Sequence, residues 1–187
     1  MRIIAGKYSS RKLETRKGSE TRPTLEKVRE AVFSSLGNLF DGGSYLDLYA
    51  GSGANGLEAI SRGMDDAVFV DCARDAINVI KKNISTLKAE KQCQVLAMKD
   101  TRALDLLSEE GKQFDVIYID PPYRKQHNHE ILTIIAEKHL LKPGGTAIIE
   151  SLKEETYTGD YPGLRYDHDR VYGITRITYY KEENRTI

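Results

Sequence analysis

The sequence predicts an α/β fold in which helices cover both faces of a mostly parallel, seven-stranded sheet. Between residues 44 and 151, short β-branched or aliphatic runs alternate with longer segments of helical periodicity, as in consecutive βαβ units. The run FDVIYID at residues 114–120 is apolar almost without alternation, which is typical of a central strand buried on both faces. The last two runs, 164–172 and 174–182, have no helical period and predict a closing antiparallel hairpin.

The alternation assigns each element in turn. The five parallel strands are expected at residues 44–50, 67–72, 93–99, 114–120 and 146–151. The four helices that connect or follow them are expected at residues 54–62, 74–88, 101–108 and 129–140. Before them, two short β-type runs around Ser9 predict a small hairpin. A helix is expected to begin at Thr24, after Pro23, with an apolar stripe at helical spacing formed by Leu25, Val28, Val32, Leu36 and Leu39.

Length and composition restrict the number of domains and the compartment that we expect for this protein. A chain of 187 residues supports one well-buried core, so we expect a basic N-terminal extension over residues 1–23 and one domain over residues 24–187. No apolar run approaches the ~20 residues of a membrane-spanning helix, and the N-terminus lacks the pattern of a secretory signal. We therefore expect a cytoplasmic protein in which Cys72 and Cys93 are free thiols.

The formal net charge of zero conceals a separation of charge along the chain. Residues 1–29, the basic arm, carry nine basic and three acidic side chains, so the rest of the chain carries a net negative charge. Such an arm attracts polyanions locally without a high overall isoelectric point. The alternative is a solvated surface on which lysines and arginines are scattered by chance.

A glycine-rich turn is the first candidate for binding chemistry. The segment DLYAGSGANG, from Asp47 through Tyr49 to Gly56, predicts a strand that runs through a tight turn into a helix. Glycines at 51, 53 and 56 allow the turn and leave no Cβ between the backbone and a nucleotide lying across the strand end. The same pattern occurs in dinucleotide-binding folds and, without a ligand, in merely tight turns.

Two carboxylates follow the next two strands. Asp71 ends the strand after the glycine turn, where a carboxylate accepts hydrogen bonds from the two hydroxyls of a ribose. That position suits NAD and S-adenosylmethionine equally well. Asp100 follows the next strand, where it can cap the N-terminus of a helix, approach an adenine amino group, or do both.

The segment Asp120-Pro121-Pro122-Tyr123 favours S-adenosylmethionine over NAD as the cofactor. It follows the central strand, at the carboxyl end where open α/β sheets bind ligands. Two prolines fix the path of the chain and aim the Asp120 carboxylate and the Pro121 carbonyl at one point. There they can accept hydrogen bonds from a planar exocyclic amine while Tyr123 stacks on the base that carries it. Hydride transfer has no use for such a loop.

The remaining candidates have simpler interpretations. The four histidines lack the spacing of a metal site, and we expect no metal. Arg124 and Lys125, after the proline loop, are placed to contact a phosphate. The tyrosine-rich C-terminal region resembles a base-stacking face, but strand packing accounts for most of it.

At this point the chain resembles a class I S-adenosylmethionine-dependent methyltransferase, specifically the RsmD type of 16S ribosomal RNA guanine-N2 methyltransferase. The resemblance covers essentially the whole chain and rests on the segments MRIIAGKYSSRKL, TRPTLEKVREAVFSSL, DLYAGSGANGLEAISRG, VFVD and DPPY. DPPY is shared with enzymes that methylate adenine amines, so it specifies the reaction better than the substrate. Family members commonly carry Glu in place of Asp71 and a polar residue in place of Ala73.

The resemblance implies a set of site residues. Those expected to bind the cofactor are Asp47, Tyr49, Gly51, Gly53, Gly56, Asp71 and Asp100, and those of the methyl-transfer loop are Asp120, Pro121, Pro122 and Tyr123. Arg22, Pro23 and Thr24 are implied to help close the site. The charge of the basic arm and the position of two residues after the proline loop, rather than the resemblance, give the residues expected to contact RNA: Arg11, Lys12, Arg16, Lys17, Arg22, Arg124 and Lys125.

The implied activity is methylation of a guanine in small-subunit rRNA, by a monomer acting on an assembling 30S particle without a membrane or a metal. An adenine-N6 methyltransferase acting on RNA or DNA is an alternative, because the same loop serves both amines. A non-catalytic RNA-binding assembly factor is another, although the intact glycine turn, Asp71 and Asp120 argue against it. A nicotinamide-dependent dehydrogenase is a further alternative, and only the glycine pattern supports it.

Overall fold

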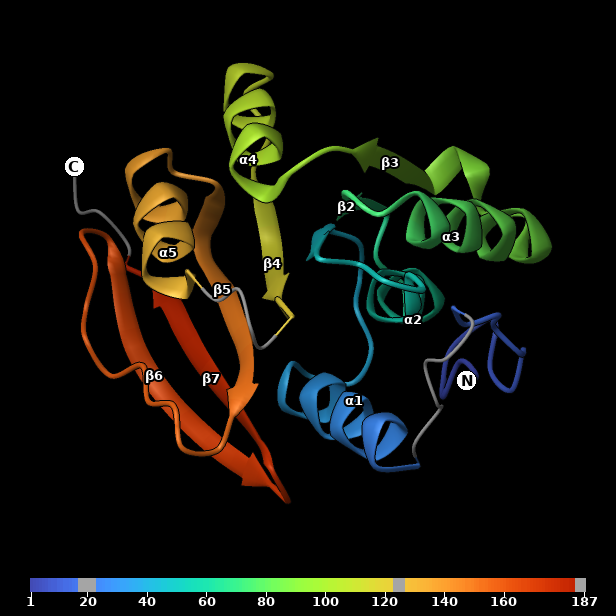
Figure 1. Cartoon of the computed structure of the whole chain (residues 1–187), viewed down its shortest axis with the longest axis horizontal. Helices are drawn as coiled ribbons and strands as arrows, with labels where there is room; N and C mark the ends of the chain where they lie inside the picture. Colours follow the sequence, from blue (N-terminus) through green and yellow to red (C-terminus); the bar gives the residue numbers. More distant parts are fainter. Residues whose placement is uncertain (17–22, 123–126, 184–187) are drawn as a thin grey trace. The chain divides into compact units, whose positions relative to one another are not determined.

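The computed structural model describes residues 1–16, 23–122 and 127–183 (Figure 1). The chain divides into two compact units, Met1–Met98 and Lys99–Ile187. The boundary expected from the sequence after residue 23 stays a prediction. Among the described residues, no helix combines the length and the apolar character that a membrane span requires.

The described residues of the first unit form three parallel strands in the order β3-β2-β1. Its elements are β1 (Ser44–Leu48), α2 (Ala54–Ser61), β2 (Asp66–Asp71), α3 (Arg74–Leu87), a 3-10 turn (Glu90–Gln92) and β3 (Cys93–Ala97). Ser44 pairs with Asp66 and Ala67 pairs with Cys93, so the strands run in register toward a common carboxyl edge. β1 is buried at every position except its first, and β2 at every position except its two ends, as the apolar runs predict.

Helix α1 (Pro23–Ser35) begins with proline, which is favoured at the first helical position because its missing N–H would have no intrahelical partner. Val28 and Val32 are buried as expected. The expectation that the apolar stripe continues to Leu39 is wrong. The helix ends at Ser35, the positive φ angles of Gly37 (108°) and Asn38 (72°) turn the chain away, and Leu39 is 65% exposed.

The first 16 residues, called the N-terminal segment below, form a short hairpin-like turn. Arg2 and Lys12 make one antiparallel bridge, and the Ile3 N–H donates to the Arg11 carbonyl at 2.9 Å. Ile3 and Leu13 are buried. The expected small hairpin is therefore present, with a ladder of a single bridge.

In the second unit, the part of the chain that the structure describes forms four strands in the order β4-β5-β7-β6. Its elements are α4 (Asp100–Glu109), β4 (Phe114–Ile119), α5 (Asn128–Glu137), β5 (Leu141–Leu152), β6 (Leu164–Tyr172) and β7 (Thr175–Glu182). β4 and β5 are parallel, whereas β7 is antiparallel to both β5 and β6. The predicted closing hairpin is thus confirmed, and α5 ends three residues earlier than the sequence pattern indicates, at Glu137.

Candidate active site

The glycine turn lies between β1 and α2 and has an unusual backbone. Positive φ angles occur at Tyr49 (68°), Gly51 (59°) and Gly53 (77°). Glycine adopts this region at no steric cost, whereas a tyrosine there is uncommon and strained. The Gly53 N–H donates to the Ala50 carbonyl at 2.7 Å and closes the turn. Strain concentrated at the end of a strand is typical of a ligand site.

The glycines of this turn have different roles. A Cβ added to Gly51 would meet no atom within 4 Å, so the backbone there is open to an approaching ligand. A Cβ added to Gly56 would lie 2.3 Å from Cε1 of Phe69, so this glycine allows α2 to pack closely against β2. Gly51 therefore suits close approach of a ligand to the backbone, whereas Gly56 suits close packing of the helix against the strand.

Asp47 lies beneath the turn rather than on its surface. The residue is 1% exposed, and its Oδ2 accepts a 2.9 Å hydrogen bond from the Gly56 N–H. Burial raises the pKa of the Asp47 carboxyl to about 7, although the Gly56 hydrogen bond opposes the shift. Its contribution to ligand binding would come through the shape of the turn, and a direct contact with a cofactor stays a prediction.

Asp71 is brought to the glycine turn, as its spacing in the sequence predicts. Its Oδ2 accepts a hydrogen bond from the Gly51 N–H at 3.0 Å, and its Oδ1 accepts one from the Ala73 N–H at 2.8 Å. Each carboxylate oxygen has a further lone pair, and the side chain is partly exposed. The carboxylate is thus held firmly beside the open backbone of Gly51 and fits the ribose of a nucleoside cofactor.

The basic candidates of the N-terminal segment are on its surface. Arg11, Lys12 and Arg16 are all exposed, which is the condition for contact with a phosphate. Lys17 and Arg22 lie outside the described residues.

In the second unit, Asp120 and the two prolines follow β4 directly, at its carboxyl end. Asp120 is partly exposed, Pro121 is buried and Pro122 is exposed. One end of the loop is therefore anchored in the core while Asp120 reaches the surface. Tyr123, Arg124 and Lys125 lie outside the described residues.

Asp100 is the first residue of α4, with Lys99 at the cap position. Its Oδ1 accepts a hydrogen bond from the Thr101 N–H at 2.7 Å, and its Oδ2 lies 3.0 Å from Nε2 of His127. His127 directly precedes α5, so this contact joins the starts of two helices. The spacing of the histidines gave no sign of it. The described residues contain no group of three or more histidine, cysteine, aspartate or glutamate side chains suited to a metal ion.

A buried acid on β5 was also missed by sequence reasoning. Ile119 pairs with Ile149, so the next residues along these parallel strands are Asp120 and Glu150. Glu150 is 6% exposed and its Oε2 accepts a 2.6 Å hydrogen bond from the Tyr118 hydroxyl. Burial raises the pKa of Glu150, and the Tyr118 hydrogen bond opposes that shift. The available signal was one acidic residue in an otherwise apolar strand.

Comparisons with known proteins agree with this arrangement. The model of the family "Conserved hypothetical protein 95" matches residues 1–181. The rRNA methyltransferase candidate YlbH of Bacillus subtilis is 38% identical over 97% of this chain and 99% of its own length. Ribosomal RNA small subunit methyltransferase D of Escherichia coli is 32% identical over 98% of this chain and 90% of its own.

Solved structures share the fold. The structure of the methyltransferase candidate yhhF from Escherichia coli has a TM-score of 0.81 and 30% identity, and the match covers 98% of both chains. The structure of SMU.776, a methyltransferase candidate complexed with SAH, has a TM-score of 0.63 at 15% identity and covers 84% of this chain and 49% of its own. The expected Rossmann-like class I methyltransferase fold is confirmed.

Proposed function

Because the chain belongs to the RsmD-type family of rRNA methyltransferases, we propose that it methylates the exocyclic N2 amine of a guanine in 16S rRNA. S-adenosylmethionine is the proposed methyl donor, and an assembling 30S particle is the proposed substrate. The protein would act in the cytoplasm as a monomer. The observation that carries the proposal is the Asp120-Pro121-Pro122 segment at the carboxyl end of β4, in a chain with this family membership.

The first unit would hold the donor. The open backbone at Gly51 and the Asp71 carboxylate beside it suit a nucleoside with a free ribose. Gly53 and Tyr49 would shape the turn, while Asp47 and Gly56 support it from below. When bound, S-adenosylmethionine supplies an electrophilic methyl group on a sulfonium. Asp100, in the second unit, is proposed to approach the adenine.

The second unit would position the acceptor amine. The Asp120 carboxylate and the Pro121 carbonyl both accept hydrogen bonds, so they suit an amine with two N–H groups and would orient its electron pair. Neither proline can donate a competing backbone hydrogen bond. Tyr123, outside the described residues, is proposed to stack on the base. The amine can release its proton after methylation, so Asp120 need not act as a base.

RNA would be bound through its backbone. Exposed Arg11, Lys12 and Arg16 suit contacts that add affinity without reading sequence. Lys17, Arg22, Arg124 and Lys125 are proposed for the same role, and they stay predictions because they lie outside the described residues.

Transfer of a labelled methyl group tests the proposal. The protein would be incubated with labelled S-adenosylmethionine and, in separate reactions, naked rRNA, DNA and small subunits from cells that lack the enzyme. Nucleoside analysis that yields N2-methylguanosine supports the proposal, and the preferred RNA form identifies the substrate. N6-methyladenosine as the product would favour the adenine enzyme. RNA binding without transfer to any substrate would favour the assembly factor.

A further inference from the structure

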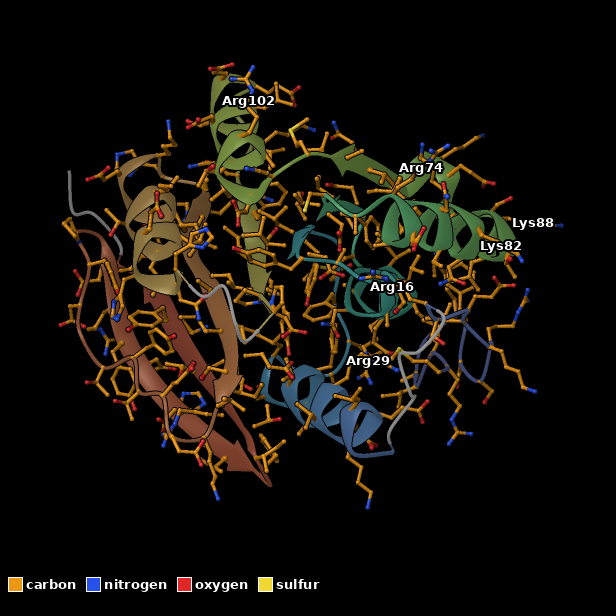
Figure 2. The ribbon with its side chains drawn as sticks, in the orientation of Figure 1. Arg16, Arg29, Arg74, Lys82, Lys88 and Arg102 are labelled. Carbon is orange, nitrogen blue, oxygen red and sulfur yellow. The ribbon has the colours of Figure 1, made fainter. Side chains whose placement is uncertain are left out.

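Helix α3 presents a row of basic side chains to solvent. Arg74 and Lys81 lie in the helix and Lys88 is its C-cap; the three are spaced by seven residues, or nearly two helical turns, and all are exposed. Figure 2 labels Arg74 and Lys88 at the two ends of α3. Another face of the helix is apolar, and its buried residues include Ile77, Ile80, Ile84 and Leu87. Packing therefore fixes the orientation of α3 and keeps its basic face outward.

The N-terminal segment is attached to the second half of the same helix. The Asn83 side chain is 2% exposed; its Oδ1 accepts a hydrogen bond from the Glu14 N–H at 2.8 Å, and its Nδ2 donates to the Glu14 carbonyl at 3.0 Å. Arg11 Nη2 donates to the Thr86 carbonyl at 3.2 Å. A buried amide that satisfies both polar groups of one residue holds that residue in a defined position. Arg11 is thereby placed beside the last turn of α3, and the segment also contacts this helix through the ion pair of Glu14 with Lys82.

Together the two elements concentrate positive charge. Residues 7–16 and 74–91 contain nine basic and three acidic side chains, in a chain with a formal net charge of zero. Of the three acids, Glu14 is already paired, since its Oε1 lies 2.5 Å from Lys82 Nζ. The uncompensated charge is thus a property of this surface and not of the whole protein.

The surface also reaches the glycine turn. Asn83 Nδ2 donates a second hydrogen bond, of 2.9 Å, to the carbonyl of Ser52. The residue that fixes the N-terminal segment therefore also contacts the turn that carries Gly51. A polyanion bound along the segment and α3 would pass close to the cofactor side of the first unit.

We propose that α3, residues 88–91 directly after it and the N-terminal segment form a single RNA-backbone-binding surface, on which Lys81, Lys88 and Lys91 contact phosphates in addition to the arginines of the segment. The choice of RNA as the polyanion rests on the proposed function. Residues 81 and 88 are separated by ~10 Å along the helix, enough for each lysine to neutralise a different phosphate. Sequence recognition is left to other residues.

The test compares the salt dependence of RNA binding for two charge-matched variants. Lys81→Gln/Lys88→Gln removes two charges from the surface, and Lys112→Gln/Arg165→Gln removes two exposed charges from the second unit. RNA affinity would be measured at several salt concentrations, and S-adenosylhomocysteine affinity at one. For the α3 variant we expect a slope of log affinity against log salt smaller by about 1.4 to 1.8, and RNA binding about 10-fold weaker at moderate salt. Cofactor affinity should not change.

Salt plots of the α3 variant that superimpose on those of the wild type would overturn the proposal, as would equal losses in the two variants or an absence of RNA binding by the wild type. Methyl transfer by the wild type is measured in parallel. If the α3 variant methylates RNA normally and its plot of log affinity against log salt has the same slope as that of the wild type, this surface is rejected. The proposed function then remains intact. RNA bound through the surface but never methylated rejects the proposed function and supports the surface.

Discussion

The Gly56 N–H donates a 2.9 Å hydrogen bond to the buried carboxylate of Asp47, which joins the first turn of α2 to β1 directly below the glycine turn. A carboxyl so deeply buried is more stable with its proton, and burial raises the pKa of Asp47 from 3.8 to about 7. The folded protein therefore retains a proton that the unfolded chain releases in this range of pH.

The first prediction follows from that difference. The free energy of unfolding contributed by Asp47 should be greatest below its ordinary pKa, fall as the pH rises toward 7 and then level off, a loss of up to about 4 kcal/mol. Asp47→Asn cannot titrate and keeps an acceptor for Gly56, so it should reduce the pH dependence. Urea unfolding at about pH 5 and about pH 8 measures this. Exposed Asp41→Asn is the control, and equal pH dependence in wild type and Asp47→Asn would contradict the prediction.

The second prediction separates the two glycines of the turn. Gly56→Ala should lower stability by about 1–3 kcal/mol or more, because its Cβ would overlap the Phe69 ring. Gly51→Ala has room for its Cβ, so it should lower stability by only about 1–2 kcal/mol, the cost of a positive φ for a residue with a Cβ. Its larger effect should be on S-adenosylhomocysteine binding, measured by calorimetry. A Gly51→Ala protein that binds like the wild type would place the ligand elsewhere.

Asp71→Ala should weaken S-adenosylhomocysteine binding about 10- to 100-fold, since a charge-assisted hydrogen bond to a ligand contributes about 1.5–3 kcal/mol. Asp71 also accepts the Gly51 N–H, so a thermal unfolding curve must accompany the calorimetry. Exposed Asp75→Asn, four residues farther along the chain, is the matched control. An unchanged dissociation constant in a folded Asp71→Ala protein would show that the ribose lies elsewhere.

Asp120→Ala should abolish methyl transfer with little effect on cofactor affinity, because its proposed partner is the acceptor amine. Asp120→Asn retains one acceptor oxygen and should keep part of the activity. Single-turnover transfer under saturating RNA measures the effect on the chemical step. Near-normal rates in a folded Asp120→Ala protein would remove Asp120 from the site.

Tyr118→Phe should lower the free energy of unfolding by about 1–3 kcal/mol, because Glu150 would lose the hydrogen bond that compensates its burial. Loss of this bond should also raise the pKa of Glu150 further, so the deficit should be larger at high pH than at low pH. Chemical denaturation at two pH values tests both points. Tyr172→Phe, at a partly exposed strand position, serves as the control. Identical stability of Tyr118→Phe and the wild type would show that the hydrogen bond contributes nothing.

The fold and the backbone of the site were predictable because their signals are local. Alternation of apolar runs marks the strands, and the turn containing Gly51 and the loop containing Asp120 each lie at the end of such a run. The end of α1 was harder to predict. Leu36 and Leu39 continue the helical spacing, but Gly37 and Asn38 adopt positive φ angles that periodicity does not report.

Buried polar contacts could not be read from the sequence. Glu58 and Arg62 are spaced like a solvated pair on a helix surface, yet both are buried, with Arg62 Nε 2.8 Å from Glu58 Oε1. Glu58 also accepts the backbone N–H groups of Ile4 and Ala5. Their burial depends on the N-terminal segment folding back over α2, which is a long-range event. The same is true of Asn83, whose two partners lie 31 and 69 residues away.

The attachment of the N-terminal segment also bears on the order in which the chain acquires its structure. The Ile4 N–H donates to Glu58, 54 positions along the chain, and the Glu14 N–H donates to Asn83, 69 positions along. The Lys7 side chain donates to Gln92, 85 positions along. The N-terminal segment therefore lacks some of its final partners until Gln92 has been synthesised. Each doubling of a loop adds only about 0.6 kcal/mol to its closure, and once one loop has closed the others form over short residual distances. The contacts that hold the N-terminal segment can thus be completed only after the chain has been synthesised as far as the turn before β3.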